Sequence, residues 1–316
     1  YALNELQVNN LVVTDMGGTT FDITCITNGE IAISREEKIG ADDYILGINK
    51  VDSRSIGAGG GSIAWIDSGG MLKVGPQSAG SMPGPVCYGY GGMNPTVTDA
   101  NVVLGYIDPN YFLGGEMKLN SKLAEKFILE KVGNYLGLDA HETAYSIWHV
   151  ANTNMMAAIQ DILTWQGIDP SDYIIVAGGG AAGLHIASIA EGLGIRKILI
   201  PKAAGTLSAA GGIFGDIRSD FGGSHFTETN RFDFEGVNAL LADLEQQAND
   251  FFEKTGVAKE NRKLDFFVES RYSGQVWEIP VSLRRNRISN SEELNEFIND
   301  FHQEHEKIFA INEPGQ

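Results

Sequence analysis

The sequence predicts an α/β fold. Short apolar runs end at glycine-rich turns, as buried strands do, and they alternate with longer segments of helical periodicity. The clearest helical segment runs from His141 to Trp165 and contains neither glycine nor proline. The chain has 316 residues, of which 43% are apolar, so it is long enough to bury a sizeable core.

The individual elements follow from local patterns. Apolar and β-branched runs beside turn residues predict strands at Leu11–Thr14, Phe21–Thr27, Glu30–Arg35, Ile174–Ala177, Lys197–Ile200, Leu264–Tyr272 and Val276–Leu283. Amphipathic spacing predicts helices at Ser121–Leu136, Asp139–Gln166, Phe234–Glu253 and Ser291–Ile308. Further helices are expected directly after Gly178–Gly180, through about Leu193, and at Thr206–Phe214, which is rich in small residues.

A change in composition predicts the domain organisation. Most of the 39 glycines cluster before residue 225, after which glycine thins out and charge rises. We therefore expect one lobe at residues 1–225 and a smaller α+β segment at 226–316. Within the first lobe, residues from about 40 to 116 are rich in glycine and proline and are expected to form a long irregular insertion.

The charge and cysteine content narrow the classes of partner. The net charge is −18, so the surface repels nucleic acids and anionic membranes, although a pocket of backbone N–H groups with Mg²⁺ can still bind a nucleotide. No apolar run reaches the about 20 residues that cross a bilayer. The two cysteines form no disulfide framework and no metal-ligand spacing, which favours a cytoplasmic location.

The first candidate site is the turn DMGGTT (Asp15–Thr20), which interrupts two apolar runs. Two glycines permit a tight turn and close approach of a ligand, and successive N–H groups with two threonine hydroxyls can bind an anion. Asp15, at the end of the strand, is placed to hold Mg²⁺ or to orient a nucleophile. An ordinary hairpin turn with no ligand is the alternative.

The second candidate site is the glycine run Gly178–Gly180, where a strand is expected to lead directly into a helix. Such a helix start can seat the phosphate or ribose of a nucleotide. Close packing of strand and helix is the alternative. The spacing also fits G-x-G-x-x-G, but the next strand ends in Pro201 and Lys202 instead of the acidic residue that a nicotinamide site requires.

Other polar residues carry weaker signals. Asp99 fits either a helix cap or a carboxylate for metal binding or proton transfer, with the cap favoured, and Thr98 is an equally good cap. His302 and His305 lack a third ligand, so a solvated helix face is favoured over a metal site. His185 is expected to be a packed helix residue.

With these residues in view, the chain resembles the hydantoinase A/oxoprolinase family, which is similar to the actin, Hsp70 and sugar-kinase group of ATPases. The resemblance covers nearly the whole chain and rests on the segments DMGGTTFD (15–22), SIGAGGGSIAWID (55–67), VGPQSAGSMPGPVCYGYGG (74–92), PTVTDANVVLG (95–105), VAGGGAAGLH (176–185), PKAAGTLSAAGG (201–212) and RYSGQVWEIPV (271–281).

The resemblance implies an actin-like (ribonuclease H-like) ATPase lobe that uses ATP and Mg²⁺ to activate a carbonyl oxygen by phosphoryl transfer. Its implied residues are Asp15 as catalytic and metal ligand; Gly17, Gly18, Thr19 and Thr20 at the phosphates; and Gly178, Gly179 and Gly180 at the nucleoside. Asp99 is a second catalytic candidate from its own sequence pattern. The implied activity is that of an amide-ring hydrolase of the hydantoinase or 5-oxoprolinase type.

Two alternatives remain open: the ATP-hydrolysing subunit of an acetone- or acetophenone-type carboxylase, and a non-catalytic nucleotide-binding assembly module. Actin-type sites use two similar hairpins, and this sequence has one Asp-x-Gly-Gly-Thr turn. We therefore expect an incomplete nucleotide site, completed by a missing N-terminal segment or a partner subunit. The expected substrate is a small cyclic amide or a ketone.

Overall fold

The computed structural model describes residues 8–34, 37–39, 44–46 and 50–315. The chain divides into two compact units, Tyr1–Gly215 and Asp216–Gln316, and each is described by itself. The boundary at 225/226 that composition suggests lies further along the chain, and it stays a prediction.

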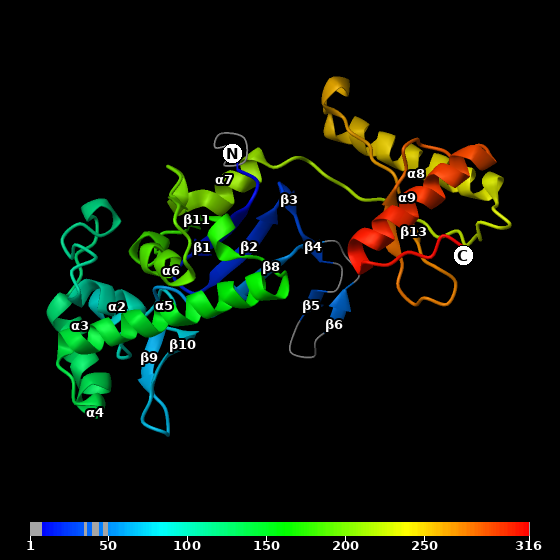
Figure 1. The fold of residues 1–316 in the computed structure, drawn as a ribbon. Helices are drawn as coiled ribbons and strands as arrows, with labels where there is room; N and C mark the ends of the chain where they lie inside the picture. Colours follow the sequence, from blue (N-terminus) through cyan, green and yellow to red (C-terminus); the bar gives the residue numbers. More distant parts are fainter. Residues whose placement is uncertain (1–7, 35–36, 40–43, 47–49, 316) are drawn as a thin grey trace. The chain divides into compact units, whose positions relative to one another are not determined.

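The first unit is built on a six-stranded mixed sheet with the order β12-β11-β1-β2-β3, in which β8 also pairs with β2 (Figure 1). Its strands are β1 (Leu11–Met16), β2 (Phe21–Thr27), β3 (Glu30–Ile31), β8 (Ser53–Ile56), β11 (Ile174–Gly178) and β12 (Ile198–Leu199). β1 runs parallel to β11 and antiparallel to β2, and β11 runs parallel to β12. The turns after β1 and β11 therefore lie at the same edge of the sheet.

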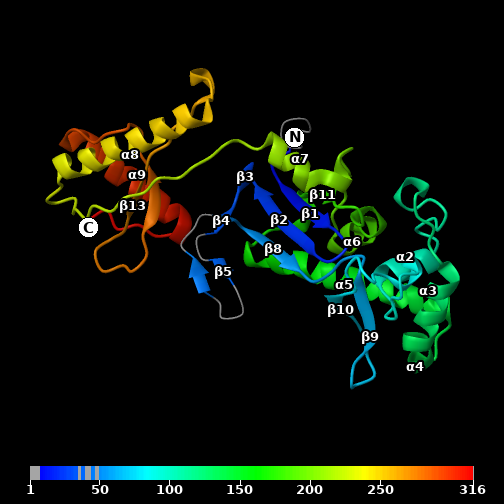
Figure 2. The same ribbon diagram turned by 180° about the vertical axis from the view of Figure 1, so that it is seen from behind.

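The pattern of burial along the strands matches a sheet covered by helices. In β2, Phe21, Ile23 and Cys25 are buried and alternate with partly exposed residues, as the two-residue period of a strand requires. These side chains belong to one hydrophobic core together with residues of α5 such as Ile147 and Met155. Figures 1 and 2 both show α5 running along the sheet.

The helices of the first unit are α2 (Val97–Val103), α3 (Ser121–Ile128), α4 (Asn134–Leu136), α5 (Ala140–Trp165), α6 (Ile186–Leu193) and α7 (Leu207–Phe214). A π-helical turn at Leu129–Gly133 joins α3 to α4. The long helix α5 begins at a capping box, in which the Asp139 side chain accepts from the Glu142 N–H and the Glu142 side chain accepts from the Asp139 N–H. None of the helices in the described residues is long and apolar enough to cross a membrane.

Two expectations about the region after β2 need correction. The predicted strand Glu30–Arg35 is divided into β3 and the short strand β4 (Ile33–Ser34), and Arg35 lies outside the described residues. The expected irregular insertion from 40 to 116 contains regular structure where it is described, because β9 (Ser62–Ile66) and β10 (Leu72–Ser78) form a hairpin whose ladder the glycine content concealed. The remaining short strands pair as β4 with β7 (Lys50–Val51) and β5 (Glu37–Ile39) with β6 (Tyr44–Leu46).

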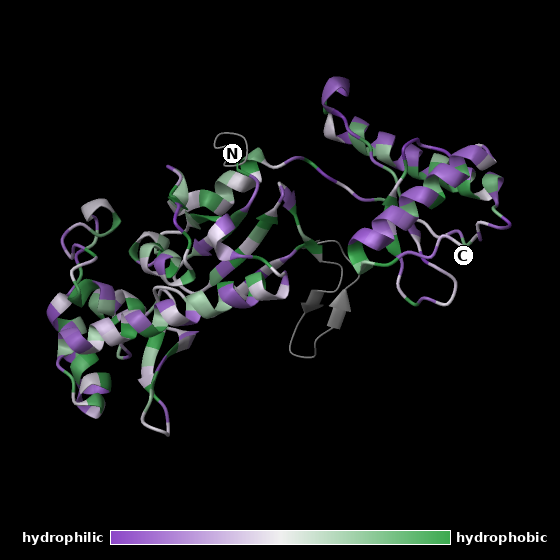
Figure 3. Ribbon diagram, in the orientation of Figure 1, coloured by the Kyte–Doolittle hydropathy of each residue, from purple (hydrophilic) through white to green (hydrophobic). Residues whose placement is uncertain are grey.

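The second unit contains the hairpin strands β13 (Phe267–Ser270) and β14 (Ile279–Ser282) with the helices α8 (Phe234–Thr255) and α9 (Ser291–Phe309). Figure 3 shows hydrophilic residues along both helices with hydrophobic ones between them. The hydrophobic residues of α9, including Leu294, Phe297 and Phe301, join Ile279 and Val281 of β14 in a separate core. An amphipathic helix packed on a hairpin thus stabilises this unit.

Candidate functional site

The turn between β1 and β2 is open to solvent. It is closed by a hydrogen bond from the Gly17 N–H to the Thr20 carbonyl at 3.2 Å. Gly18, Thr19 and Thr20 are exposed, and Asp15 just before them is half-buried. The Thr19 hydroxyl and the Gly18 N–H of this turn are therefore accessible to a ligand.

The two glycines of the turn are not explained by backbone conformation. Neither Gly17 nor Gly18 has a positive φ, and a Cβ atom added to either would meet no heavy atom within 4 Å. The sequence suggested that these glycines are needed for a tight turn, and the structure does not show that need. The open space above both residues instead leaves room for a ligand to approach the backbone closely.

The glycine run after β11 lies directly beside this turn. Asp15 of β1 pairs with Gly178 of β11, and the Ala181 N–H donates to the Met16 carbonyl at 3.0 Å. Gly179 has φ +87°, and a Cβ there would lie 2.2 Å from Met16 O and 2.5 Å from Asp15 Oδ1. Only glycine fits where these two segments cross.

One expectation about this run is wrong. Gly178–Gly180 does not open a helix, because α6 begins only at Ile186, after a 3₁₀ turn at Ala182–Leu184. Gly180 is nevertheless exposed, and a Cβ there would meet nothing within 4 Å. The run therefore offers open backbone at Gly180 alone, and no helix N-terminus.

A third glycine segment packs against the turn from the other side. The Gly60 and Gly61 N–H groups donate to the carbonyls of Gly17 and Gly18 at 3.0 Å and 2.6 Å. A Cβ on Gly59 would lie 2.7 Å from Gly18 C and 2.7 Å from Thr19 N. These contacts fix the position of the turn and explain why this segment is so rich in glycine.

Two polar residues that the sequence reasoning did not select also lie at the turn. Asp22 pairs with Asp15 across β1 and β2, which brings two carboxylates side by side, and the Thr20 hydroxyl donates to Asp22 Oδ2 at 3.1 Å. The Ser208 hydroxyl donates to Asp15 Oδ2. The hairpin register could have identified Asp22, whereas no sequence pattern places Ser208 here.

These residues fit a phosphate group with Mg²⁺. Mg²⁺ is usually held by one or two carboxylates together with phosphate oxygens and water, and Asp15 and Asp22 supply two carboxylates beside exposed N–H and hydroxyl donors. Within the described residues, no group of three or more His, Cys, Asp or Glu side chains could hold a metal ion. Asp15 and Asp22 would supply only part of a Mg²⁺ coordination shell, and phosphate oxygens and water would supply the rest.

Asp99 is enclosed within the protein. It is 0% exposed, and its two oxygens accept hydrogen bonds from the Val86 and Cys87 N–H groups and from the N–H and hydroxyl of Thr96, at 2.7–3.1 Å. The helix cap of α2 is Thr96, with Asp99 as its capping-box partner, and neither Asp99 nor Thr98 is the cap. This geometry favours the structural role of Asp99, and its catalytic role stays a prediction.

The expected solvated face at His302 and His305 is wrong. Their exposed fractions are 8% and 3%, because Tyr272 and Phe301 pack around both rings. The Tyr272 hydroxyl lies 2.5 Å from His302 Nδ1, and Gln275 Nε2 lies 2.9 Å from His305 Nε2. Burial, with a smaller contribution from His305, lowers the pKa of His302. The two histidines therefore form part of the core of the second unit.

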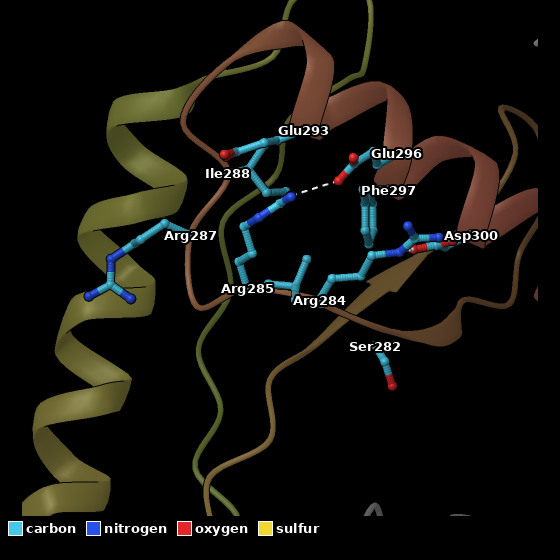
Figure 4. Close-up of a pocket in the computed structure, with 10 residues that line it drawn as sticks. Ser282, Arg284, Arg285, Arg287, Ile288, Glu293, Glu296, Phe297 and Asp300 are labelled. Carbon is cyan, nitrogen blue, oxygen red and sulfur yellow. Dashed lines mark hydrogen bonds and ion pairs between the residues drawn. The ribbon is translucent and has the colours of Figure 1, made fainter.

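Two cavities are lined by residues outside the turns Asp15–Thr20 and Gly178–Gly180. The one in Figure 4, in the second unit, has a volume of about 20 Å³, which is room for a single water molecule. Its walls are tied by ion pairs from Arg284 to Asp300 and from Arg285 to Glu296. The other, of about 260 Å³, lies at the amino ends of β1, β11 and β12. Ligands of open α/β sheets bind at the carboxyl ends of the strands, where Asp15 and Gly178 are found.

The fold defines the class of the protein. It is an α/β protein whose glycine-rich turns meet at the carboxyl edge of a mixed sheet. The chain belongs to the hydantoinase/oxoprolinase family: the model of the hydantoinase/oxoprolinase family matches residues 1–221, and that of the hydantoinase/oxoprolinase C-terminal domain matches residues 228–313. The family resemblance drawn from the sequence motifs is thereby confirmed.

Sequence comparison with individual proteins supports this family assignment. The chain is 38% identical over 314 residues to the caprolactamase subunit alpha of Pseudomonas jessenii, covering 97% of this chain and 44% of that protein. It is 35% identical over 326 residues to the acetophenone carboxylase gamma subunit of Aromatoleum aromaticum, covering 100% of this chain and 44% of that protein. The chain thus spans under half the length of these relatives.

Solved structures show the same fold. Nucleotide-free acetone carboxylase matches with a TM-score of 0.81 and 25% identity, over 98% of this chain and 45% of that one. The ATP-dependent caprolactamase of Pseudomonas jessenii matches with a TM-score of 0.74 and 36% identity, over 100% of this chain and 46% of that one. The α/β class predicted from the sequence is confirmed.

Proposed function

We propose that this chain is the nucleotide-binding part of an ATP-dependent enzyme that opens a cyclic amide by activating its carbonyl oxygen. The observation that carries the proposal is the exposed turn Asp15–Thr20 at the carboxyl end of β1, placed beside Gly178–Gly180 by the parallel pairing of β1 with β11. The similarity to an ATP-dependent caprolactamase and to the family of oxoprolinases supports it.

Each part of the turn has a role in this proposal. The Gly18 N–H and the Thr19 hydroxyl bind phosphate oxygens, and open space at Gly17 and Gly18 admits the ligand. The Gly17 N–H, which donates to the Thr20 carbonyl, and the Thr20 hydroxyl, which donates to Asp22, hold the shape of the turn beside the phosphate. Within the run Gly178–Gly180, the exposed backbone of Gly180 receives the nucleoside, and Gly178 and Gly179 pack behind it. Asp15 is the catalytic carboxylate and binds Mg²⁺ directly or through water. ATP, when bound, supplies the phosphoryl group that makes the amide oxygen easier to displace.

The fit of the nucleotide depends on how the three glycine segments are held together. Hydrogen bonds from Gly60 and Gly61 hold the carbonyls of Gly17 and Gly18, and the Gly17 N–H closes the turn onto Thr20. The Gly18 N–H is left to face a ligand. Donors that are already oriented bind a phosphate without further reorganisation, which is the main contribution a protein makes to phosphoryl transfer.

We also propose that another segment or subunit completes the nucleotide site. The sequence has one Asp-x-Gly-Gly-Thr turn, the chain spans under half the length of its relatives, and those relatives are named as subunits. The two cysteines, Cys25 and Cys87, are both free and buried, which agrees with a cytoplasmic location.

A second candidate is the ATP-hydrolysing subunit of a ketone carboxylase. The TM-score of 0.81 to acetone carboxylase favours it, whereas the identity of 36% favours the caprolactamase. If both reactions begin with phosphorylation of a carbonyl-derived oxygen, as the proposal has it for the amide, the same turn serves either one. The substrate pocket that separates them is decided by other parts of the enzyme.

One assay separates these functions. Phosphate release is measured with the full-length protein and its partner subunits, using hydantoins, 5-oxoproline or caprolactam in one series and ketones with bicarbonate in another. Stimulation by a cyclic amide supports the hydrolase, and stimulation by a ketone supports the carboxylase. ATP turnover that no substrate stimulates supports a non-catalytic module.

The role of the turn is tested by one substitution in the same system. Asp15→Ala is expected to abolish phosphate release while leaving the circular dichroism spectrum and the unfolding midpoint close to those of the parent. Full turnover in Asp15→Ala would remove the turn from the mechanism and with it the proposed function.

A further inference from the structure

Ser208 lies at the candidate site although it is far from it in the sequence. It belongs to the first turns of α7, and its hydroxyl donates to Asp15 Oδ2 across a separation of 193 positions. Asp15 is the carboxylate to which the proposed function assigns the metal and the reaction. Ser208 therefore contacts the most important side chain of the site.

The backbone around Ser208 is anchored to the strand that carries the glycine run. The Gly179 N–H donates to the Ala204 carbonyl at 2.7 Å, and the Leu207 side chain packs so closely on Gly178 that a Cβ there would lie 2.6 Å from Leu207 Cδ2. The start of α7 is thus fixed beside the end of β11, independently of the hydroxyl of Ser208.

The bond to Asp15 is not a by-product of side-chain packing. None of the residues of α7 is buried, and Ser208 itself is exposed. An exposed serine satisfies its hydroxyl with water at no cost, so the hydroxyl has no structural need for this carboxylate. The carboxylate, in contrast, gains a fixed orientation from it.

The orientation matters because the two oxygens of Asp15 have different surroundings. Oδ2 accepts a hydrogen bond from Ser208. Oδ1 lies against Gly179, where a Cβ atom added to that glycine would be 2.5 Å from it. A half-buried aspartate without the serine can rotate between its allowed χ positions. Losing a group that orients a metal-binding carboxylate typically costs about 10- to 100-fold in metal affinity or activity.

We propose that Ser208 is a positioning residue that holds the Asp15 carboxylate in the orientation needed for Mg²⁺ and the phosphoryl group. The inference rests on the proposed function of Asp15 and adds to it a residue from α7. Ser208 forms no covalent bond and transfers no proton. Its effect on turnover passes entirely through Asp15.

Turnover is measured in the full-length enzyme with its partner subunits, comparing Ser208→Ala, Ser208→Thr and the control Ser146→Ala. Ser146 is also a helical serine, but its hydroxyl donates to the Glu142 carbonyl of its own helix. Ser208→Ala is expected to lower kcat by about 10- to 100-fold with an unchanged KM for the cyclic amide. Ser208→Thr, which keeps the hydroxyl, restores most of the rate, and Ser146→Ala matches the parent.

Binding provides a readout that does not depend on turnover. Calorimetry with Mg²⁺ and a β,γ-imido analogue of ATP is carried out on the parent, Ser208→Ala, Asp15→Ala and the double variant. Because Ser208 acts through Asp15, its removal is expected to weaken binding about tenfold in the parent and less than about twofold in Asp15→Ala. Equal weakening in both backgrounds, or none in the parent, overturns the inference.

The kinetic outcomes are equally decisive. An unchanged kcat in Ser208→Ala, or a loss in Ser208→Thr as large as in Ser208→Ala, overturns the inference. If Asp15→Ala abolishes turnover while Ser208→Ala matches the parent, only the role of Ser208 fails. If Asp15→Ala retains full turnover, the proposed function fails first.

Discussion

The Nδ1 atom of His185 lies 2.7 Å from Oδ1 of Asn152, at a junction of α5 with the segment that follows the glycine run. An amide oxygen only accepts, so Nδ1 carries the proton of the neutral ring, and Nε2 accepts from Asn101 Nδ2 of α2 at 3.1 Å. The imidazole is 1% exposed, and burial lowers its pKa to about 4. His185 thus joins three segments around the candidate site as an uncharged group.

This junction predicts a loss of stability in mild acid. The unfolded chain protonates His185 near its ordinary pKa of 6.5, whereas the folded chain resists protonation down to about pH 4. The free energy of unfolding therefore has its full value above pH 6.5 and falls as the pH drops towards 4, by about 3 kcal/mol in total. Urea unfolding followed by circular dichroism between pH 7.5 and 4.5 measures it.

The control for this prediction is His185→Gln, which cannot titrate. The variant is expected to be less stable at pH 7, but its free energy of unfolding should fall less steeply between pH 6.5 and 4.5 than that of the parent. Parallel pH profiles for the two proteins would contradict the assignment of the acid loss to His185.

Removing the Asp99 carboxylate is predicted to destabilise the first unit. Asp99→Ala leaves the buried N–H groups of Val86, Cys87 and Thr96 without their acceptor. Each buried donor left unpaired costs about 1–3 kcal/mol, so the free energy of unfolding is expected to fall by about 3 kcal/mol or more. Asp108→Ala is the control, because its exposed carboxylate accepts from the Asn110 N–H in a surface turn. Stability like that of the control, with turnover lost, would assign Asp99 to catalysis instead.

The glycine run after β11 offers a test that separates folding from binding. Gly180→Ala places a methyl group in open space without a positive φ, so the unfolding midpoint should not change, whereas binding of Mg²⁺ and the ATP analogue should weaken about tenfold. Gly183→Ala, also in open space, is the control for an added methyl group. Unaltered nucleotide affinity in Gly180→Ala would place the nucleoside elsewhere.

The neighbouring glycine is expected to behave in the opposite way. Gly179→Ala combines a positive φ with a Cβ that would lie 2.2 Å from Met16 O, so β1 and β11 must separate for it to fit. We expect the free energy of unfolding to fall by about 2 kcal/mol or more, in the range of strained backbone positions. A midpoint equal to that of Gly180→Ala would show that the crossing is looser than the structure indicates.

The second unit carries its own buried polar junction at Tyr272. The Tyr272 hydroxyl contacts His302 Nδ1 and accepts from the Glu313 N–H at 2.8 Å, so Tyr272→Phe removes partners from both. A loss of about 1–3 kcal/mol is expected, with faster hydrogen exchange at Glu313. Tyr111→Phe, at a side chain that is 70% exposed, should leave both measurements unchanged. Unaltered exchange at Glu313 in Tyr272→Phe would show that the hydroxyl does not hold it.

The sequence predicted much of the candidate site because its signals are local. The turn Asp15–Thr20 and the run Gly178–Gly180 are each readable within a few residues, and the structure leaves open space at Gly17, Gly18 and Gly180. Asp22 was missed although the hairpin register was available. Ser208 could not be found, since its contact with Asp15 depends on where a later helix crosses the sheet edge.

Burial was the property that local patterns predicted least well. His302 and His305 look like residues of a polar face because charged residues surround them in the sequence, and only packing against Tyr272 makes them part of a core. At Asp99 the sequence favoured a helix cap over a catalytic group, and its four hydrogen bonds and complete burial support a structural role beside the true cap, Thr96.

The sequence by itself determined the α/β class, the long helix α5, the position of both glycine-rich turns and the family. These depend on hydrogen bonding and hydrophobic periodicity between residues that are close along the chain. Only the tertiary structure decided that Asp15 pairs with Gly178 and binds Ser208, and that the segment 59–61 contacts the turn. Such contacts join segments far apart in the sequence, so their geometry follows from how the core packs and no local pattern encodes it.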